Sequence, residues 1–100
     1  MIIPDKIKSD DLVVQLKTRS KYAFSVLYDN YASALLGIAT KIVRNQQVGE
    51  DVLQEVFIKI WRNIDTYDNL KGTLFTWMLN ITRNESNDYL RSKQYTINYK

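Results

Sequence analysis

The chain has 100 residues, 45% hydrophobic and 25% charged, which is the size and balance of one small globular domain. It contains no cysteine and no histidine, so disulfide frameworks, thiolate metal sites and histidine ligands are excluded. The N-terminal residues lack the basic head and apolar core of a signal peptide. The longest uncharged stretches have about 11 residues, whereas a membrane-spanning helix needs about 20. We therefore expect one intracellular domain.

The formal net charge of +3 is unevenly distributed along the chain. Residues 1–44 and residues 71–100 each carry +3, whereas residues 45–70 carry −3. A chain with an acidic middle and a basic end can present two different faces to two different partners. An evenly solvated surface explains the same charges more simply.

Apolar residues at steps of three and four predict an all-α fold, a small bundle of about four helices. The first helix is expected to start after Ser9, which can cap it, and to end near Lys17 to Arg19. Ser20 can cap the second helix. The predicted buried stripe of this helix consists of Phe24, Leu27, Tyr28, Tyr31, Leu35, Ile38 and Ile42.

A polar turn is predicted from Asn45 to Gly49, before the third helix. The predicted core row of this helix is Val52, Val56, Ile60 and Ile64, with Leu53, Phe57 and Trp61 beside it. A loop is expected from Asp65 to Gly72, and Thr73 can cap a fourth helix that runs to about Ser92. The inner side of the fourth helix is expected to carry Leu74, Trp77, Met78 and Ile81. The pattern leaves Gln94 to Lys100 undetermined.

One isoleucine of the third helix, Ile58, falls outside the predicted buried arc. Its neighbours on the helix surface are Asp51, Gln54, Glu55 and Arg62. One exposed isoleucine is ordinary on any protein surface. An apolar side chain with a polar rim also has the make-up of a small docking patch. The residues alone favour the ordinary interpretation and leave docking open.

A polar strip is predicted on the fourth helix. Its members recur at steps of four and three: Asn80, Asn84, Asn87 and Arg91, with Arg83 and Thr76 at the edge. The carboxylates of Glu85 and Asp88 are expected to point elsewhere. Asn and Arg hydrogen-bond to base edges and phosphates, so nucleic-acid contact and a merely solvated face are equally compatible with this strip. Stacking on unpaired bases is open to Tyr67, Tyr89, Tyr95 and Tyr99, although a tyrosine at the edge of a bundle more often only packs there.

The residue types and motifs of the chain do not support an enzyme. Phosphate-binding glycine loops are absent, and no Ser–His or Cys–His pair is possible. The Glu-x-x-His pairs of a di-iron bundle are also absent. Glu50, Asp51 and Glu55 lie on a helix surface with no cleft implied. We expect no enzyme activity, no cofactor and no metal.

Segments spread over most of the chain follow the motif order of a known family. The third-helix segment is Gly49-Glu-Asp-Val-Leu-Gln-Glu-Val-Phe-Ile-Lys-Ile-Trp61-Arg62, and Asp65-Thr-Tyr67, Gly72-Thr73 and Trp77-Met-Leu-Asn-Ile-Thr-Arg-Asn84 follow it. Ala23-Phe-Ser-Val-Leu27-Tyr28-Asp-Asn-Tyr31 precedes it. In this order and spacing, the segments resemble region 2 of bacterial sigma-70 family factors, most closely the extracytoplasmic-function (ECF) type. The resemblance covers about residues 10–93.

The resemblance implies an RNA polymerase specificity subunit. In such factors the third helix docks on the coiled coil of the polymerase β′ subunit. By motif position this role falls on Asp51, Gln54, Glu55 and Ile58, with Arg62 nearby. The next helix recognises and helps to melt the promoter −10 element and holds the non-template strand as single-stranded DNA. The loop before it, in this chain about Asp65 to Thr73, holds a flipped-out base.

The expected DNA contacts are Asn80, Arg83, Asn84, Asn87 and Arg91 of the strip, and Lys71 of the loop. Asn84, from the Arg-Asn pair, is the position that the family motif supports most directly. Family members usually carry Arg where Asn80 stands, and more arginines after Arg91 than Lys93 alone. Phosphate neutralisation is therefore expected to be weak, and binding of the isolated domain to DNA poor and salt-sensitive.

The resemblance also implies what surrounds the domain. We expect residues 1–93 to form the region 2 domain, with its core at about 10–93, and residues 94–100 to begin a linker to an absent C-terminal region 4 domain. An anti-sigma factor is the implied regulator, and the bacterial cytoplasm the implied location, without direct membrane insertion. Two alternatives stay open: a helical protein–protein interaction module without a DNA role, and a small enzyme.

Overall fold

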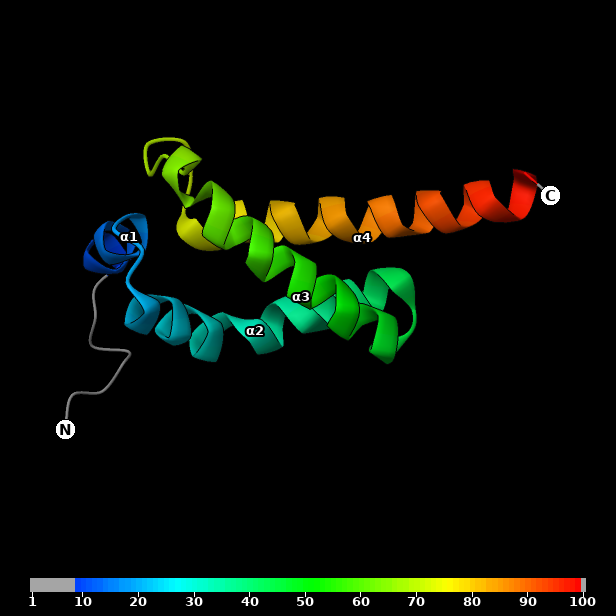
Figure 1. Cartoon of the computed structure of the whole chain (residues 1–100), viewed down its shortest axis with the longest axis horizontal. Coiled ribbons are helices and arrows are strands. Elements are labelled where there is room, and N and C mark those ends of the chain that lie inside the picture. Colours follow the sequence, from blue (N-terminus) through cyan, green and yellow to red (C-terminus); the bar gives the residue numbers. More distant parts are fainter. Residues whose placement is uncertain (1–8, 100) are drawn as a thin grey trace.

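The computed structural model describes residues 9–99 and the side chains of residues 11–93, and this part is helical (Figure 1). Its elements are α1 (Ser9–Lys17), α2 (Lys21–Val43), α3 (Gln46–Asn63), the one-turn 3-10 helix η2 (Ile64–Thr66) and α4 (Leu74–Tyr99). Helices α2, α3 and α4 pack against one another, and α1 lies at one end of the bundle against α2 and η2. The predicted all-α bundle is confirmed. The cap predicted at Ser9 and the side chains of the predicted linker lie outside the described side chains.

Two predicted helix caps are confirmed. The side chain of Ser20 accepts a hydrogen bond from the Ala23 amide at 3.1 Å, at the start of α2. Thr73 Oγ1 accepts one from the Thr76 amide, also at 3.1 Å, at the start of α4. Each cap satisfies an amide that has no partner within the first turn of its helix.

The polar turn predicted from Asn45 to Gly49 is wrong. Asn45 Oδ1 accepts a hydrogen bond from the Val48 amide at 3.0 Å, so Asn45 is the cap and α3 begins at Gln46. An asparagine favours both turns and helix caps, and polarity alone therefore misplaces this boundary.

Two further boundaries differ from prediction. Helix α4 continues to Tyr99, past the end expected near Ser92, because no glycine or proline follows Thr73 to stop it. The loop expected from Asp65 to Gly72 begins with the single 3-10 turn of η2 and is irregular afterwards.

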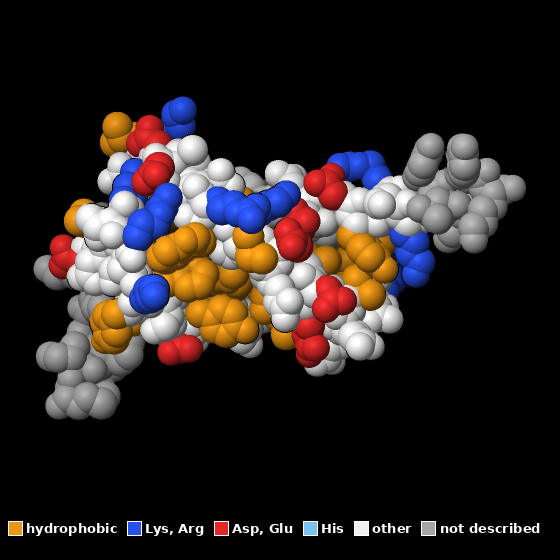
Figure 2. All heavy atoms as spheres, in the orientation of Figure 1, with side chains coloured by type: hydrophobic (Ala, Val, Ile, Leu, Met, Phe, Trp, Pro, Cys, Tyr) orange, Lys and Arg blue, Asp and Glu red, His pale blue; other side chains and the backbone are white. Residues whose placement is uncertain are grey.

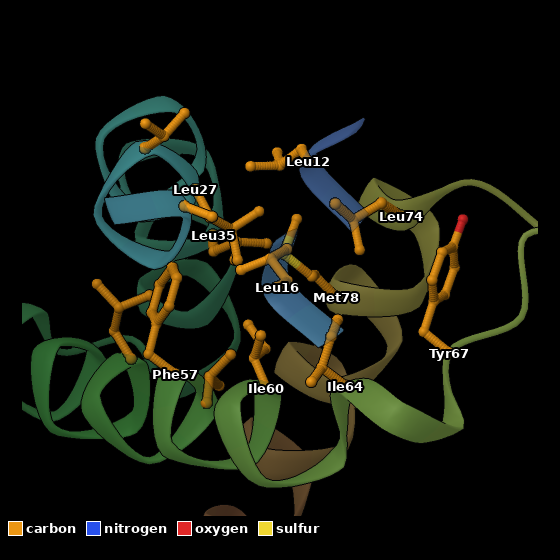
Figure 3. Close-up of a cluster of buried hydrophobic side chains, with 14 of the residues drawn as sticks. Leu12, Leu16, Leu27, Leu35, Phe57, Ile60, Ile64, Tyr67, Leu74 and Met78 are labelled. Atoms are coloured by element: carbon orange, nitrogen blue, oxygen red, sulfur yellow. The ribbon is translucent and has the colours of Figure 1, made fainter. Parts of the chain in front are cut away.

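All four α-helices and η2 contribute to one hydrophobic core (Figure 3). Its buried members are Leu12, Leu16, Ala23, Val26, Leu27, Leu35, Ala39, Val43, Val52, Leu53, Val56, Phe57, Ile60, Ile64, Tyr67, Leu74 and Met78. The row predicted on the third helix, from Val52 to Ile64, is therefore confirmed. On α4, Leu74 and Met78 are buried as predicted, and Trp77 and Ile81 are half-buried.

The stripe predicted on α2 is only partly right. Leu27 and Leu35 are fully buried, whereas Tyr28 is 46% exposed. Half-buried positions are Phe24, Tyr31, Ile38 and Ile42. The stripe omits Ala23, Val26, Ala39 and Val43, which are buried. Because α2 packs against both α3 and α4, its buried arc is broad, and small residues let the neighbouring helices approach closely.

Two hydroxyl residues of α4 are fully buried, which the apolar pattern did not indicate. Thr82 Oγ1 donates to the Met78 carbonyl oxygen at 2.9 Å, and Ser86 Oγ donates to the Thr82 carbonyl oxygen at 2.8 Å. These bonds within the helix satisfy the hydroxyl groups, so that small polar side chains fit the interior.

Candidate functional site

Helix α3 turns the five predicted docking residues to one side. Asp51, Gln54, Glu55 and Arg62 are exposed, and Ile58 is 41% exposed. At about 100° per residue, their side chains fall within an arc of about 100°. The buried residues of α3 occupy the opposite arc. The predicted exposure of Ile58 is therefore confirmed.

Ile58 lies at the edge of a groove between α2 and α3, which we call the aromatic groove. It is lined by Phe24, Tyr28, Gln54, Phe57, Ile58, Trp61 and Arg62. Figure 2 shows apolar side chains gathered over this part of the surface. Helical periodicity assigned the aromatic residues to the core and so did not reveal this surface.

Edge-to-face contacts hold the groove together. The ring of Phe24 lies 5.8 Å from that of Phe57 and 5.2 Å from that of Trp61, nearly perpendicular to both. The ring of Tyr28 lies 4.8 Å from that of Phe57. Aromatic pairs at these separations are favourable beyond the area that they bury. The groove is thus a preformed apolar surface with Gln54 and Arg62 at its polar rim.

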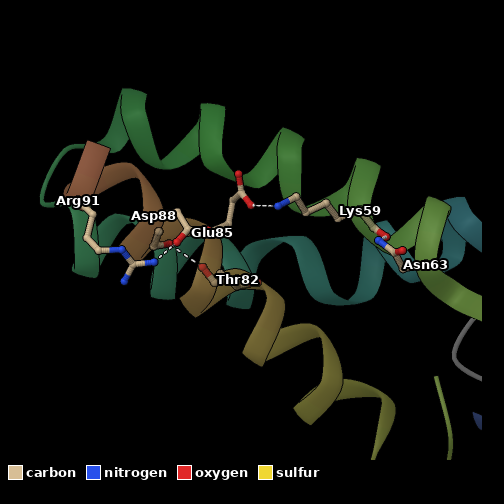
Figure 4. A network of polar contacts seen from close by, with 7 residues as sticks. Lys59, Asn63, Thr82, Glu85, Asp88 and Arg91 are labelled. Carbon is tan, nitrogen blue, oxygen red and sulfur yellow. Dashed lines mark hydrogen bonds and ion pairs between the residues drawn. The ribbon is translucent and has the colours of Figure 1, made fainter. Parts of the chain in front are cut away.

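An ion pair joins α3 to α4 (Figure 4). Lys59 Nζ lies 2.5 Å from Glu85 Oε1. The hydrogen bond to Glu85 raises the pKa of Lys59 above its ordinary value of 10.5, and the negative charges of Asp88 and Glu55 add to this effect. Lys59 is therefore engaged between the helices.

The strip predicted on α4 is exposed along its whole length. Its members Asn80, Asn84, Asn87 and Arg91 are exposed, as are Arg83 and Thr76 at its edge. The expectation that Asp88 points elsewhere is wrong, because its carboxylate pairs with the Arg91 guanidinium (Figure 4). Residues three apart on a helix are neighbours, which brings the two charges together. Because Arg91 is paired, Arg83 is the cation of this surface that forms no ion pair with the described side chains.

The loop from Tyr67 to Thr73 is built around a buried tyrosine. Tyr67 is only 5% exposed, its ring lies 5.5 Å from that of Trp77, and its hydroxyl donates to the Gly72 carbonyl oxygen at 2.8 Å. Figure 3 shows this hydroxyl directed away from the core cluster. Of the two roles left open for Tyr67, stacking on a base or ordinary packing, the burial of its side chain supports packing. Tyr89 is half-buried against the core, and the side chains of Tyr95 and Tyr99 lie outside the described part.

Two hollows flank this loop, and α1 contributes to both. One is lined by Val13, Tyr31, Phe75 and residues of the loop, and the other by Val13, Val14, Lys17 and partly the same loop residues. Lys71, the predicted loop contact to DNA, lines both and is exposed. The two hollows beside the loop are therefore candidate binding sites.

Neither a metal site nor a membrane span is found in the part of the chain that the structure describes. No group of three or more His, Cys, Asp or Glu residues there is placed to hold a metal ion. None of the described helices combines the length and apolar character needed to cross a bilayer.

A family model for sigma-70 region 2 matches residues 27–96, which include α2 from Leu27, all of α3 and most of α4. This chain belongs to the sigma-70 region 2 family. Both candidate surfaces of this sigma region 2 chain, on α3 and on α4, lie inside the matched residues, whereas α1 lies outside them.

Curated relatives of this region 2 chain are ECF RNA polymerase sigma factors. SigK of Mycolicibacterium vanbaalenii is 31% identical over 85 residues, which cover 85% of this chain and 43% of the relative. SigK of Mycobacterium ulcerans is 28% identical over 90 residues, covering 87% and 48%. SigK of Mycobacterium tuberculosis (strain H37Ra) is 27% identical over 93 residues, covering 91% and 50%. The chain spans about half the length of these relatives.

Proposed function

We propose that this chain is the part of a transcription initiation factor that docks on RNA polymerase and binds the promoter −10 element. Membership of the sigma-70 region 2 family and the names of the relatives support the role. The observation that carries the proposal is the exposure of the α3 motif residues beside the aromatic groove. An exposed Ile58 beside an apolar groove with a polar rim has the make-up of a docking surface.

The docking half of the proposal assigns the α3 face to the coiled coil of the polymerase β′ subunit. Apolar contact at Ile58 and the aromatic groove supplies the binding energy, since buried aromatic anchors dominate protein interfaces. Gln54 and Arg62 at the rim of the groove, with Asp51 and Glu55 on the same face of α3, fix register and orientation.

The DNA half of the proposal assigns the α4 strip to the non-template strand. Arg83 neutralises phosphate charge, and Asn80, Asn84 and Asn87 offer amide donors and acceptors to unpaired bases. Melting costs about 1.4 kcal/mol per base-pair step, and capture of an unstacked base beside the loop offsets part of that cost. With one strip cation paired to Asp88, the domain alone binds DNA weakly, and polymerase supplies most of the affinity.

The ECF relationship extends the proposal to the chain's surroundings. We assign it an anti-sigma factor as a regulatory partner and the bacterial cytoplasm as its location, where polymerase and promoter DNA meet.

The DNA role is tested with polymerase core, this chain and a pool of single-stranded oligonucleotides. Asn84→Ala should weaken capture of the oligonucleotides several-fold, because it removes an amide from the strip. Asn30→Ala is the matched control, an exposed asparagine on α2. If both variants capture DNA like the unchanged chain while still binding polymerase, the chain is an interaction module without a DNA role.

A further inference from the structure

Arg19 holds a backbone conformation that favours glycine. Its φ is 65°, and it follows the last residues of α1, where its amide bonds to the Leu16 carbonyl oxygen at 2.9 Å. The Ser20 amide bonds to the Gln15 carbonyl oxygen at 3.0 Å, which completes the turn that commonly ends a helix with glycine. A side chain at such a position strains the backbone, and strain of this kind often accompanies a functional constraint.

The Arg19 side chain connects two parts of the proposed site. Its Nη2 atom lies 3.1 Å from Oδ2 of Asp65, in the 3-10 helix η2 that leads into the loop. Its guanidinium carbon lies 5.6 Å from the centre of the Trp61 ring, in the wall of the aromatic groove. The aromatic face fixes the plane of the guanidinium and aims it at Asp65.

Lys17, the last residue of α1, contacts the first residue of the loop. Lys17 Nζ donates to the Tyr67 carbonyl oxygen at 2.7 Å. Beyond this point the hydrogen bonds of the loop stay within it: the Leu70 amide to Asp68 Oδ1 at 2.9 Å, the Lys71 amide to the Asp68 carbonyl oxygen at 3.0 Å, and the Tyr67 hydroxyl to the Gly72 carbonyl oxygen at 2.8 Å. Leu70 at its tip is 90% exposed. The contacts from α1 therefore anchor the loop to the body of the domain, next to its buried tyrosine.

We propose that α1 and the turn that ends it form a positioning element for the loop, in which Lys17 and Arg19 hold the shape that receives an unstacked nucleobase. The inference rests on the proposed DNA function and goes beyond it, because α1 lies outside the residues that the family model matches. Val13 of α1 lines both hollows beside the loop, so the helix also supplies a wall for the base. A loop held in its binding shape loses less conformational freedom when it binds.

Substituting glycine separates positioning from folding. Arg19→Gly removes the contacts to Asp65 and Trp61 and relieves the backbone strain. Arg44→Gly is the matched control, because Arg44 also has a positive φ of 59°, caps α2 and is exposed. Hydrogen exchange of the loop amides should become about fivefold faster in Arg19→Gly, because the variant loses one ion pair and one cation–π contact. In Arg44→Gly the exchange of these amides should stay unchanged. Equal exchange in the two variants overturns the positioning role.

The base-receiving role is tested by selection from a pool of single-stranded oligonucleotides bound to polymerase core and this chain. The unchanged chain should enrich one base at one position, and Arg19→Gly should lower that enrichment about fivefold, in line with its loss of two contacts. Arg19→Lys keeps a charge for Asp65 but not the planar stacking, and should fall between them. An enrichment ratio does not depend on the folded fraction, so a purely structural role leaves it unchanged.

The outcomes separate this inference from the proposed function. Faster loop exchange in Arg19→Gly with undiminished base enrichment overturns the inference and leaves DNA capture standing. No enrichment by the unchanged chain overturns both base capture and the positioning role of α1. If Arg44→Gly lowers the enrichment as much as Arg19→Gly does, the cause is the general loss of positive charge. That result overturns the specific role of Arg19.

Discussion

Gly49 of α3 lies directly against Thr40 of α2. A β-carbon at Gly49 would stand 2.3 Å from Thr40 Oγ1 and 3.0 Å from Thr40 Cα. The hydroxyl can rotate away, but the α-carbon belongs to the helix backbone and cannot. The crossing of α2 and α3 therefore requires a residue without a side chain at this point.

Gly49→Ala should destabilise the domain. Overpacking at such a contact costs about 1–3 kcal/mol, which the better helix propensity of alanine, about 1 kcal/mol, offsets only in part. Gly37→Ala is the control, because nothing lies within 4 Å of a β-carbon there. It should stabilise the chain by about 0.5–1 kcal/mol. Urea unfolding of both variants measures the difference, and equal stabilities would contradict the close approach of the helices.

The same glycine shows what the sequence can and cannot reveal about the fold. A glycine after polar residues favours a turn, and the turn predicted there was wrong, because the reason for the glycine lies on α2, nine residues earlier. Ser20 and Thr73 were predicted correctly, since a cap depends only on the residues next to it. Thr82 and Ser86 were missed because their burial depends on packing between helices, which no local pattern contains.

Lys59→Met should alter how stability depends on alkaline pH. The pKa of Lys59 is raised by Glu85, so the ion pair contributes fully below pH 10.5 and is lost as the pH rises through the raised value. The difference in unfolding free energy between the unchanged chain and Lys59→Met should be at most about 1 kcal/mol at pH 7, as for surface pairs. It should shrink above pH 10.5. A difference that stays constant from pH 7 to pH 12 would show that the pair contributes through packing alone.

Tyr67→Phe should loosen the loop without affecting the rest of the core. The hydroxyl donates to the Gly72 carbonyl oxygen, and loss of a buried hydrogen bond costs about 1 kcal/mol. Tyr22→Phe is the comparison, because Tyr22 is 54% exposed and its hydroxyl is free to bond to water. Thermal unfolding should register a lower midpoint only for Tyr67→Phe. Similar midpoints for the two variants would show that the hydroxyl does not hold the loop.

Asn80→Arg should strengthen DNA binding and make it more dependent on salt. The substitution adds one cation to a strip in which Arg91 is paired with Asp88. One more phosphate contact steepens the slope of log K against log salt by about 0.7 for single-stranded DNA. Asn30→Arg adds the same charge on α2 and should leave the slope nearly unchanged. Fluorescence titrations at several salt concentrations give both slopes, and equal slopes would contradict the placement of DNA along the α4 strip.

The candidate site was predicted from the sequence to different degrees on its two helices. On α3, helical periodicity identified Ile58 as the exception to a clear apolar stripe, and the structure confirms its exposure. The aromatic groove beside it was missed, because Phe24 and Trp61 come from different helices and form a surface only after the helices pack. On α4, the spacing of the polar residues identified the strip. The pairing of Asp88 with Arg91 depends on the side-chain rotamers, which the spacing does not determine.

Titration of the folded chain with a fragment of the polymerase β′ coiled coil tests the central claim most directly. Gln54→Ala and Ile58→Ala should each weaken binding, and Ile58→Ala by about tenfold or more if it is one of the few residues that dominate the interface. Val14→Ala on α1 removes another exposed apolar side chain and should bind like the unchanged chain. Docking through α3 predicts binding that both α3 variants weaken and the α1 variant does not. No binding by a chain that circular dichroism shows to be helical, or equal effects of all three variants, would contradict it.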